Sequence, residues 1–144
     1  MKQKFSTHWK GSVQPRKQRK YLANAYWHIN HKLISANLSK KLREKYKRRS
    51  FPVRKDDVVK IMRGEFKKKT GKVENIDYKR SRVIIDGIFR TKKDGTKVKV
   101  YFTTSNLQIQ ELNLNDKMRL KSLQRNKEVK RENKELKENA PKKK

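Results

Sequence analysis

Few residues in this chain have the types and spacing that metal or acid–base chemistry requires. His28 and His31 are three residues apart, so on a helix they would share one face. The chain has no cysteine, and no nearby carboxylate completes a ligand set. We therefore expect no metal at this pair, and we interpret both imidazoles as hydrogen-bonding groups for phosphate or ribose.

Three aspartates offer the other chemical possibility, a metal-dependent nuclease. Asp56 and Asp57 follow Arg54-Lys55, and Asp77 lies further along the chain. Local salt bridging is the simpler interpretation of these carboxylates. Since the sequence also contains no convincing Ser/His/Asp set, we expect no enzyme, no cofactor and no small-molecule substrate.

The most informative pattern is the segment 62–73, which places a basic tip between two glycines. Gly64 and Gly71 would permit a tight backbone at each end, and Gly71 would occupy a position with positive φ. Phe66 fits two roles, stacking on an RNA base or covering the protein core. The pattern is not a P-loop, because Gly-x₄-Gly-Lys-Ser/Thr is missing. The cations predicted to contact phosphate are Arg63, Lys67, Lys68, Lys69 and Lys72.

A second set of candidates lies in the first third of the chain, where basic residues alternate with aromatic ones. Such a mixture is typical of an extension laid along RNA, although a basic tail without specific contacts would have a similar composition. The candidates here are Arg16, Lys17, Arg19, Lys20, Trp27, His28, His31 and Lys32. Further candidates, on and after a predicted helix, are Lys40, Arg43, Lys47, Arg48, Arg49, Arg54 and Lys55.

The overall charge supports a polyanionic partner. The 144 residues include 43 Lys or Arg and 14 Asp or Glu, for a net charge of +29. Such a charge repels itself in an isolated compact state, and nucleic acid relieves it better than an anionic membrane surface does. We find no apolar run of membrane-spanning length and no secretory signal, so we expect no membrane insertion. The absence of cysteine fits a reducing compartment.

The elements that would position these residues are mainly β. Short strands are predicted at 57–62, 71–76, 82–86 and 97–102, and a fifth around Leu107 and Ile109. Asp94-Gly95 is a strong hairpin signal between the third and fourth strands, and Gly95 supplies the turn. In the fourth strand Val98, Val100 and Phe102 should share a face. Five short strands predict a small, partly open barrel.

The flanking segments differ from this barrel in composition. Residues 1–50 form a predicted basic extension with one short helix near 39–47, which Ser39 would cap. Residues 51–110 hold the barrel. Residues 111–144 should form a charged helix beginning near Asn115 or Asp116, followed by a tail that is disordered from Pro141.

The residues 53–66 and 71–73 resemble a KOW motif, with Gly71 at its hallmark glycine. The flanking stretches at 14–20, 31–36, 38–46 and 49–55 narrow the resemblance to the archaeal and eukaryotic form of large-subunit ribosomal protein twenty-four. Its eukaryotic member is called protein twenty-six. The resemblance covers about residues 14–123. There are departures: Lys68 stands where glycine is expected, Tyr26 where proline is common, and 103–106 read Thr-Thr-Ser-Asn.

This resemblance implies an SH3-like barrel that binds domain I of large-subunit ribosomal RNA. It also implies an early role in subunit assembly, neighbouring large-subunit proteins as partners, and a place near the polypeptide exit tunnel of the cytoplasmic ribosome. The main rival is a free KOW-type transcription regulator, which would normally carry a polymerase-binding domain as well.

Overall fold

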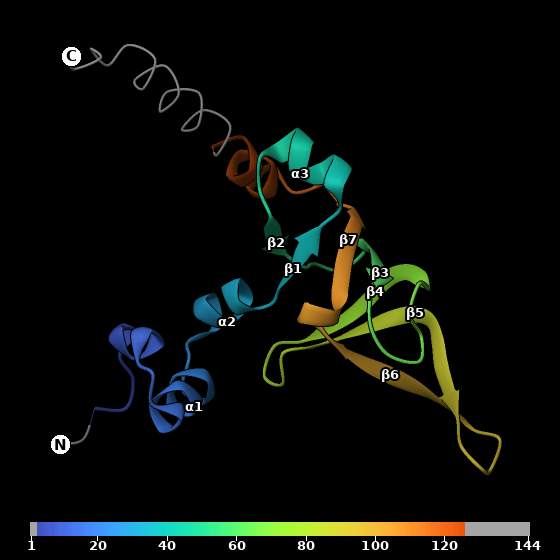
Figure 1. Ribbon diagram of the computed structural model, residues 1–144, viewed down its shortest axis with the longest axis horizontal. Helices are drawn as coiled ribbons and strands as arrows, with labels where there is room; N and C mark the ends of the chain where they lie inside the picture. The colour runs from blue at the N-terminus through green and yellow to red at the C-terminus, as the bar shows by residue number, and fades with distance from the viewer. Residues whose placement is uncertain (1–2, 126–144) are drawn as a thin grey trace, which may run out of the picture.

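The computed structural model describes residues 3–125, and its central element is one β-sheet of seven strands (Figure 1). The strands are β1 (Ser35–Leu38), β2 (Ser50–Pro52), β3 (Val58–Ile61), β4 (Thr70–Asp77), β5 (Arg82–Thr91), β6 (Lys97–Thr103) and β7 (Leu107–Glu111). The helices are α1 (Pro15–Ala23), α2 (Trp27–Leu33) and α3 (Lys40–Tyr46), the short 3₁₀ helices η1 (Thr7–Gly11) and η2 (Thr104–Asn106), and a helical segment at 117–125.

The strands join in one sheet in the order β2-β1-β7-β3-β4-β5-β6. All neighbours are antiparallel except β1 and β7, which run parallel. The prediction of five strands was therefore too low, because β1 and β2 extend the sheet beyond β7. Hydrogen bonds do not close the sheet, since β2 and β6 are its two edges.

Strand β4 joins the two halves of the sheet. Its first residues, Thr70 to Lys72, pair with β3, whereas Val73 to Asp77 pair with β5. The register between β4 and β5 shifts between Val73 and Asn75, an irregularity of the kind that bends a strand. The sheet can therefore turn across β4, and side chains from both halves meet in one hydrophobic core.

Gly71 is needed for a reason other than the one its sequence context predicted. It is not among the residues with positive φ, so the expected turn conformation is wrong. It lies within β4, where an added Cβ would stand 2.7 Å from Ile85 Cγ2 and 2.8 Å from the Asp86 carbonyl oxygen. Only glycine lets β5 approach this closely. The glycines that do adopt positive φ include Gly64 and Gly95, at 93° and 79°.

The core is formed by alternate side chains of β3 and β7, by the consecutive buried residues Val83, Ile84 and Ile85 of β5, and by residues that precede these strands. Val59 and Ile109 are completely buried, as the alternation predicts, and Val83 is completely buried as well. Of the face predicted for β6, Phe102 is buried and Val100 packs against the core, but Val98 is 40% exposed. Val98 pairs with Arg90 on the part of the hairpin that projects beyond the core, so the prediction fails there.

Two helix predictions are confirmed in outline. Helix α3 covers most of 39–47, but the Ser39 side chain makes no capping hydrogen bond. The segment 117–125 is helical, and Asp116 caps it by accepting from the backbone N–H of Met118 at 2.7 Å. The tail predicted beyond Gln124 lies, except for Arg125, outside the described residues.

The first third of the chain is more ordered than the sequence predicted. In place of one short helix it holds α1, α2 and α3, with β1 between the last two. An aromatic cluster fastens α1 to the segment before it: the Phe5 ring stacks on buried Tyr21 at 5.3 Å and meets Tyr26 edge-on at 5.1 Å. In Figure 1, α1 and α2 lie at the left, on the far side of the sheet from the tip of the β5–β6 hairpin, whereas α3 lies at the top.

Candidate nucleic-acid interface

Helix α1 carries the first group of predicted phosphate contacts. Pro15 stands at its first turn, where its fixed φ suits a helix start. Tyr21 faces inward, and the four predicted cations Arg16, Lys17, Arg19 and Lys20 are all exposed. Lys20 Nζ lies 4.6 Å from the centre of the Trp9 ring and donates to the Gln3 carbonyl at 3.0 Å. The helix therefore presents a basic surface to solvent, and aromatic side chains of the protein pack beneath it.

Helix α2 holds the two histidines in different surroundings. The His31 ring stacks on Tyr78, from the β4–β5 turn, at 4.1 Å, and Trp27 lies 5.1 Å from the same tyrosine. His28 instead stacks on Tyr26. Within residues 3–125 no group of three His, Asp or Glu side chains could hold a metal ion. Trp27 is 64% exposed and Lys32 is exposed, so both remain available to a partner.

The next group surrounds the end of α3. Lys47 ends the helix in the left-handed conformation, with φ of 53°, and thereby turns the chain toward β2. Arg43 Nε donates to the Leu38 carbonyl at 2.8 Å, and the Arg48 guanidinium lies 5.3 Å from the Phe51 ring centre. Four of the predicted cations come together with Glu44 around a shallow hollow: Arg43, Lys47, Arg48 and Arg49. Lys40 is exposed at the start of α3.

The loop between β3 and β4 presents its lysines to solvent. Lys68 takes the positive φ of 74° where the resemblance led us to expect glycine, and its N–H donates to the Ile61 carbonyl at 2.8 Å. Phe66 is half-buried, packs against the core and meets Phe102 edge-on at 6.1 Å. Of the two roles left open for Phe66, the structure shows the packing role, and stacking on RNA stays a prediction. Arg63, Lys67, Lys68, Lys69 and Lys72 are exposed.

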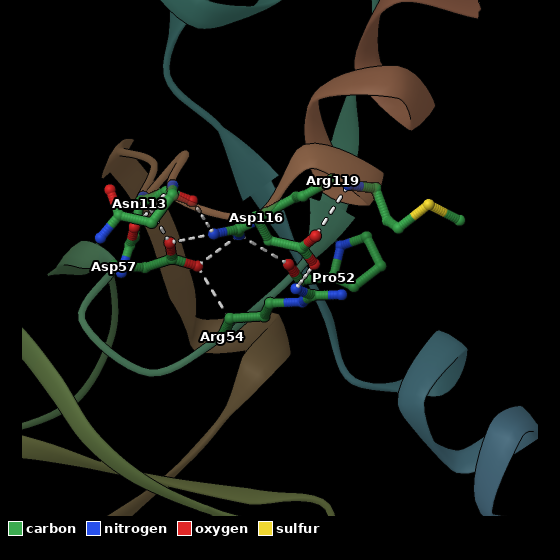
Figure 2. Close-up of polar contacts among 8 residues, drawn as sticks. Pro52, Arg54, Asp57, Asn113, Asp116 and Arg119 are labelled. Atoms are coloured by element: carbon green, nitrogen blue, oxygen red, sulfur yellow. Dashed lines mark hydrogen bonds and ion pairs between the residues drawn. The ribbon is translucent and has the colours of Figure 1, made fainter.

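A buried ion pair joins Asp57, the residue directly before β3, to Arg119 of the helical segment 117–125 (Figure 2). Both Asp57 oxygens accept from Arg119, at 2.7 Å each, and both side chains are at most 2% exposed. Asp57 also accepts the backbone N–H groups of Arg54 at 2.8 Å and Asn113 at 2.9 Å. The expectation of a salt bridge at Asp57 was right, but its partner lies 62 residues away instead of next to it in sequence.

A second, exposed pair lies beside the buried one. Arg54 donates to Asp116, and this hydrogen bond, followed by that from the Met118 N–H, lowers the pKa of the Asp116 carboxyl below its ordinary value. Arg54 is thereby tied to the residue that caps the helical segment 117–125. Lys55 is exposed nearby, and Asp56 adopts a positive φ of 67°.

Sequence reasoning missed one basic surface, the projecting β5–β6 hairpin. Its exposed side chains include Phe89 at 41% and Tyr101 at 48%. Arg90 forms an ion pair with Glu65 at 2.6 Å, which ties the hairpin to the β3–β4 loop. The Asp94-Gly95 turn and the run of lysines around it were a usable signal. The exposed cations here are Arg90, Lys92, Lys93, Lys97 and Lys99.

These groups define a strongly basic protein that spreads exposed cations over several elements around one bent sheet. Such a distribution is typical of a protein that follows a nucleic-acid backbone. In the described part of the chain, no helix is both long and apolar enough to span a membrane.

Comparison with known proteins gives the family. Residues 12–126 match the model for eukaryotic ribosomal protein L26 and its archaeal counterpart, ribosomal protein L24. The chain is also 47% identical, over 114 residues, to the large ribosomal subunit protein uL24 of Methanosphaera stadtmanae, an alignment that covers 79% of this chain and 97% of the relative. The chain therefore belongs to this ribosomal protein family, and the resemblance seen in the sequence is confirmed. It is a constituent of the large ribosomal subunit in the cytoplasm.

Proposed function

We propose that this protein binds domain I of large-subunit ribosomal RNA and assists early assembly of the subunit, near the polypeptide exit tunnel. The single observation that carries the proposal is the exposure of nearly every predicted cation in a chain of this ribosomal family. The strands β3–β7 act as the SH3-like KOW module, and neighbouring large-subunit proteins are its further partners. No observation favours the alternative of a free transcription regulator.

The physical basis is a division of labour between surfaces. Cations from α1, the α3 corner and the β3–β4 loop neutralise phosphates and fix the orientation of the protein on RNA. Trp27, on the same helix as the exposed Lys32, offers an exposed ring that suits stacking on an unpaired base. The structural role needs no catalytic group, and we propose none.

Filter binding to separate transcripts of the ribosomal RNA domains tests this proposal. The protein should bind the domain I transcript more tightly than a transcript of another domain of equal length. The logarithm of the binding constant should fall with the logarithm of salt concentration by about 0.7–0.9 per phosphate contact. Equal affinity for both transcripts at each salt concentration would contradict the assignment to domain I.

A further inference from the structure

A cavity of about 340 Å³ opens between three segments that are far apart in the sequence. Lys32 comes from α2, and Met118 and Arg119 come from the helical segment 117–125. Between them, Arg48 precedes β2 and Phe51 lies within it. Pro52, Arg54 and Ser122 complete the lining. Pocket walls drawn from such distant segments exist only in the folded chain, and none of the motifs in the sequence points to this cavity.

The lining combines cations with apolar surface. Lys32, Arg48 and Arg54 supply three positive charges, and Asp116, which pairs with Arg54, is the neighbouring carboxylate. Met118 is 70% exposed and offers an apolar contact. Arg48 lies 5.3 Å and Arg119 5.4 Å from the centre of the Phe51 ring, so the aromatic ring orders both guanidinium groups.

Arg119 also carries an unused donor. Its Nε is buried, and no hydrogen-bond acceptor among residues 3–125 reaches it. Its two terminal nitrogens, in contrast, donate to Asp57 and to the backbone carbonyls of Asn113 and Pro52. A buried N–H without an acceptor is costly, which favours a ligand that brings one. A ligand that fits this cavity therefore carries a negative charge and a flat or apolar group.

We propose that this cavity receives a single nucleotide extruded from the RNA. The phosphate lies against Lys32, Arg48 and Arg54, and the base lies against Met118 and the Arg48 guanidinium plane. The volume lies near the lower end of the range for ligand pockets, roughly 300–1,000 Å³, so it suits one nucleotide and excludes a helix. This inference rests on the proposed RNA-binding function and adds the kind of RNA feature recognised.

The buried Asp57–Arg119 pair gives the cavity a fixed wall. It holds the helical segment 117–125 against the sheet before any RNA arrives, so little ordering is needed on binding (Figure 2). Extruding a base costs least where the base is already unpaired. A single-nucleotide bulge is therefore the expected target.

The test uses five RNA hairpins with one common stem: one fully paired, and four with a single bulged A, C, G or U. Filter binding at fixed salt measures the affinity of the full-length protein for each. We expect at least one bulged hairpin to bind about tenfold more tightly than the paired one. The double variant Lys32→Ala/Met118→Ala should bind that bulged hairpin and the paired one equally. A control variant, Lys41→Ala/Val13→Ala, removes one exposed lysine and one exposed apolar side chain outside the cavity and should keep the preference.

Two results would overturn the inference while leaving RNA binding intact. The first is equal, salt-dependent binding of all five hairpins by the unmodified protein. The second is a bulge preference that survives in Lys32→Ala/Met118→Ala. An unmodified protein that shows no salt-dependent affinity for any hairpin would contradict the proposed function itself, and the inference with it.

Discussion

At the scale of single residues, two positions show how backbone demands differ from what residue types suggest. Gly71 lies in a strand and makes room for a neighbouring strand, whereas Lys68 adopts a left-handed conformation that usually favours glycine. Both facts depend on φ angles and close contacts that the sequence does not display. The positive φ expected at Gly71 was therefore wrong and that at Lys68 was missed, although the loop itself was found and Gly64 does adopt a positive φ.

Replacing Gly71 with Val should destabilise the fold. The new Cβ would meet Ile85 and the Asp86 backbone at under 3 Å, and crowding of this kind costs about 1–3 kcal/mol. Urea unfolding followed by circular dichroism measures the loss. Gly11→Ala is the matched control, because a Cβ there meets no atom within 4 Å, and it should change stability little. Equal effects would contradict the close-approach account.

The opposite change is expected at Lys68. Lys68→Gly should leave the free energy of unfolding unchanged or raise it by up to about 1 kcal/mol, because glycine takes a positive φ without the steric cost that lysine bears. The same urea titration measures the free energy of unfolding of this variant. Lys67→Gly, one residue earlier and not among the residues with positive φ, should be destabilising. A loss of stability in Lys68→Gly as large as in Lys67→Gly would show that the loop lacks this conformation.

The buried ion pair makes a third prediction at this scale. Asp57→Leu should cost about 3–5 kcal/mol, because it leaves the Arg119 charge buried without its partner. Adding Arg119→Met should recover part of that loss, but not all, since two backbone N–H groups still lose the carboxylate. The urea midpoints of unfolding of the single and double variants measure both changes in stability. A double variant less stable than the single one would refute the explanation.

At the scale of elements, the strands with clear alternation could be predicted and the short ones could not. The predicted strands correspond to β3–β7, and Asp94-Gly95 correctly marked a hairpin turn. Strands β1 and β2 have four and three residues, too few to show a period. β1 pairs with β2 and also with β7, about 70 residues away, so only the fold reveals that Ala36 and Leu38 belong to the core. The Asp57–Arg119 pair could not be predicted from the sequence either, because its two residues are 62 positions apart and meet only in the fold.

This placement of β1 decides where the N-terminal extension can be cut. Deleting residues 1–31 should leave the sheet folded, whereas deleting 1–37 should destabilise it, because Ile34 and Ala36 are buried and the Ile34 carbonyl accepts from Val53. Circular dichroism in urea compares the two truncations. Equal stability of both would mean that β1 contributes nothing to the core.

The shorter truncation also tests the role of α1 in RNA binding. If its four exposed cations each contact a phosphate, the deletion should flatten the salt dependence of binding by about 3 in the log–log slope. Filter binding of the 1–31 deletion against the full chain, on the same RNA, measures this. An unchanged slope would exclude α1 as a phosphate-binding surface.

At the scale of the whole molecule, the composition predicted a polyanionic partner, and the family resemblance predicted that this partner is the ribosome. A charge of +29 indicates a polyanion but does not select the ribosome. The order of the short motifs between residues 14 and 123 pointed to a ribosomal protein family, and the family match over residues 12–126 confirmed that family. What composition could not show is the placement of the cations on separate elements around one core.

Sedimentation of the endogenous protein tests the central claim most directly. A cell extract is separated on a sucrose gradient at physiological salt, and the protein is detected in each fraction. We expect it to sediment with the large ribosomal subunit and to be released when salt is raised enough to screen phosphate contacts. Protein that stays at the top of the gradient while large subunits sediment would contradict the claim.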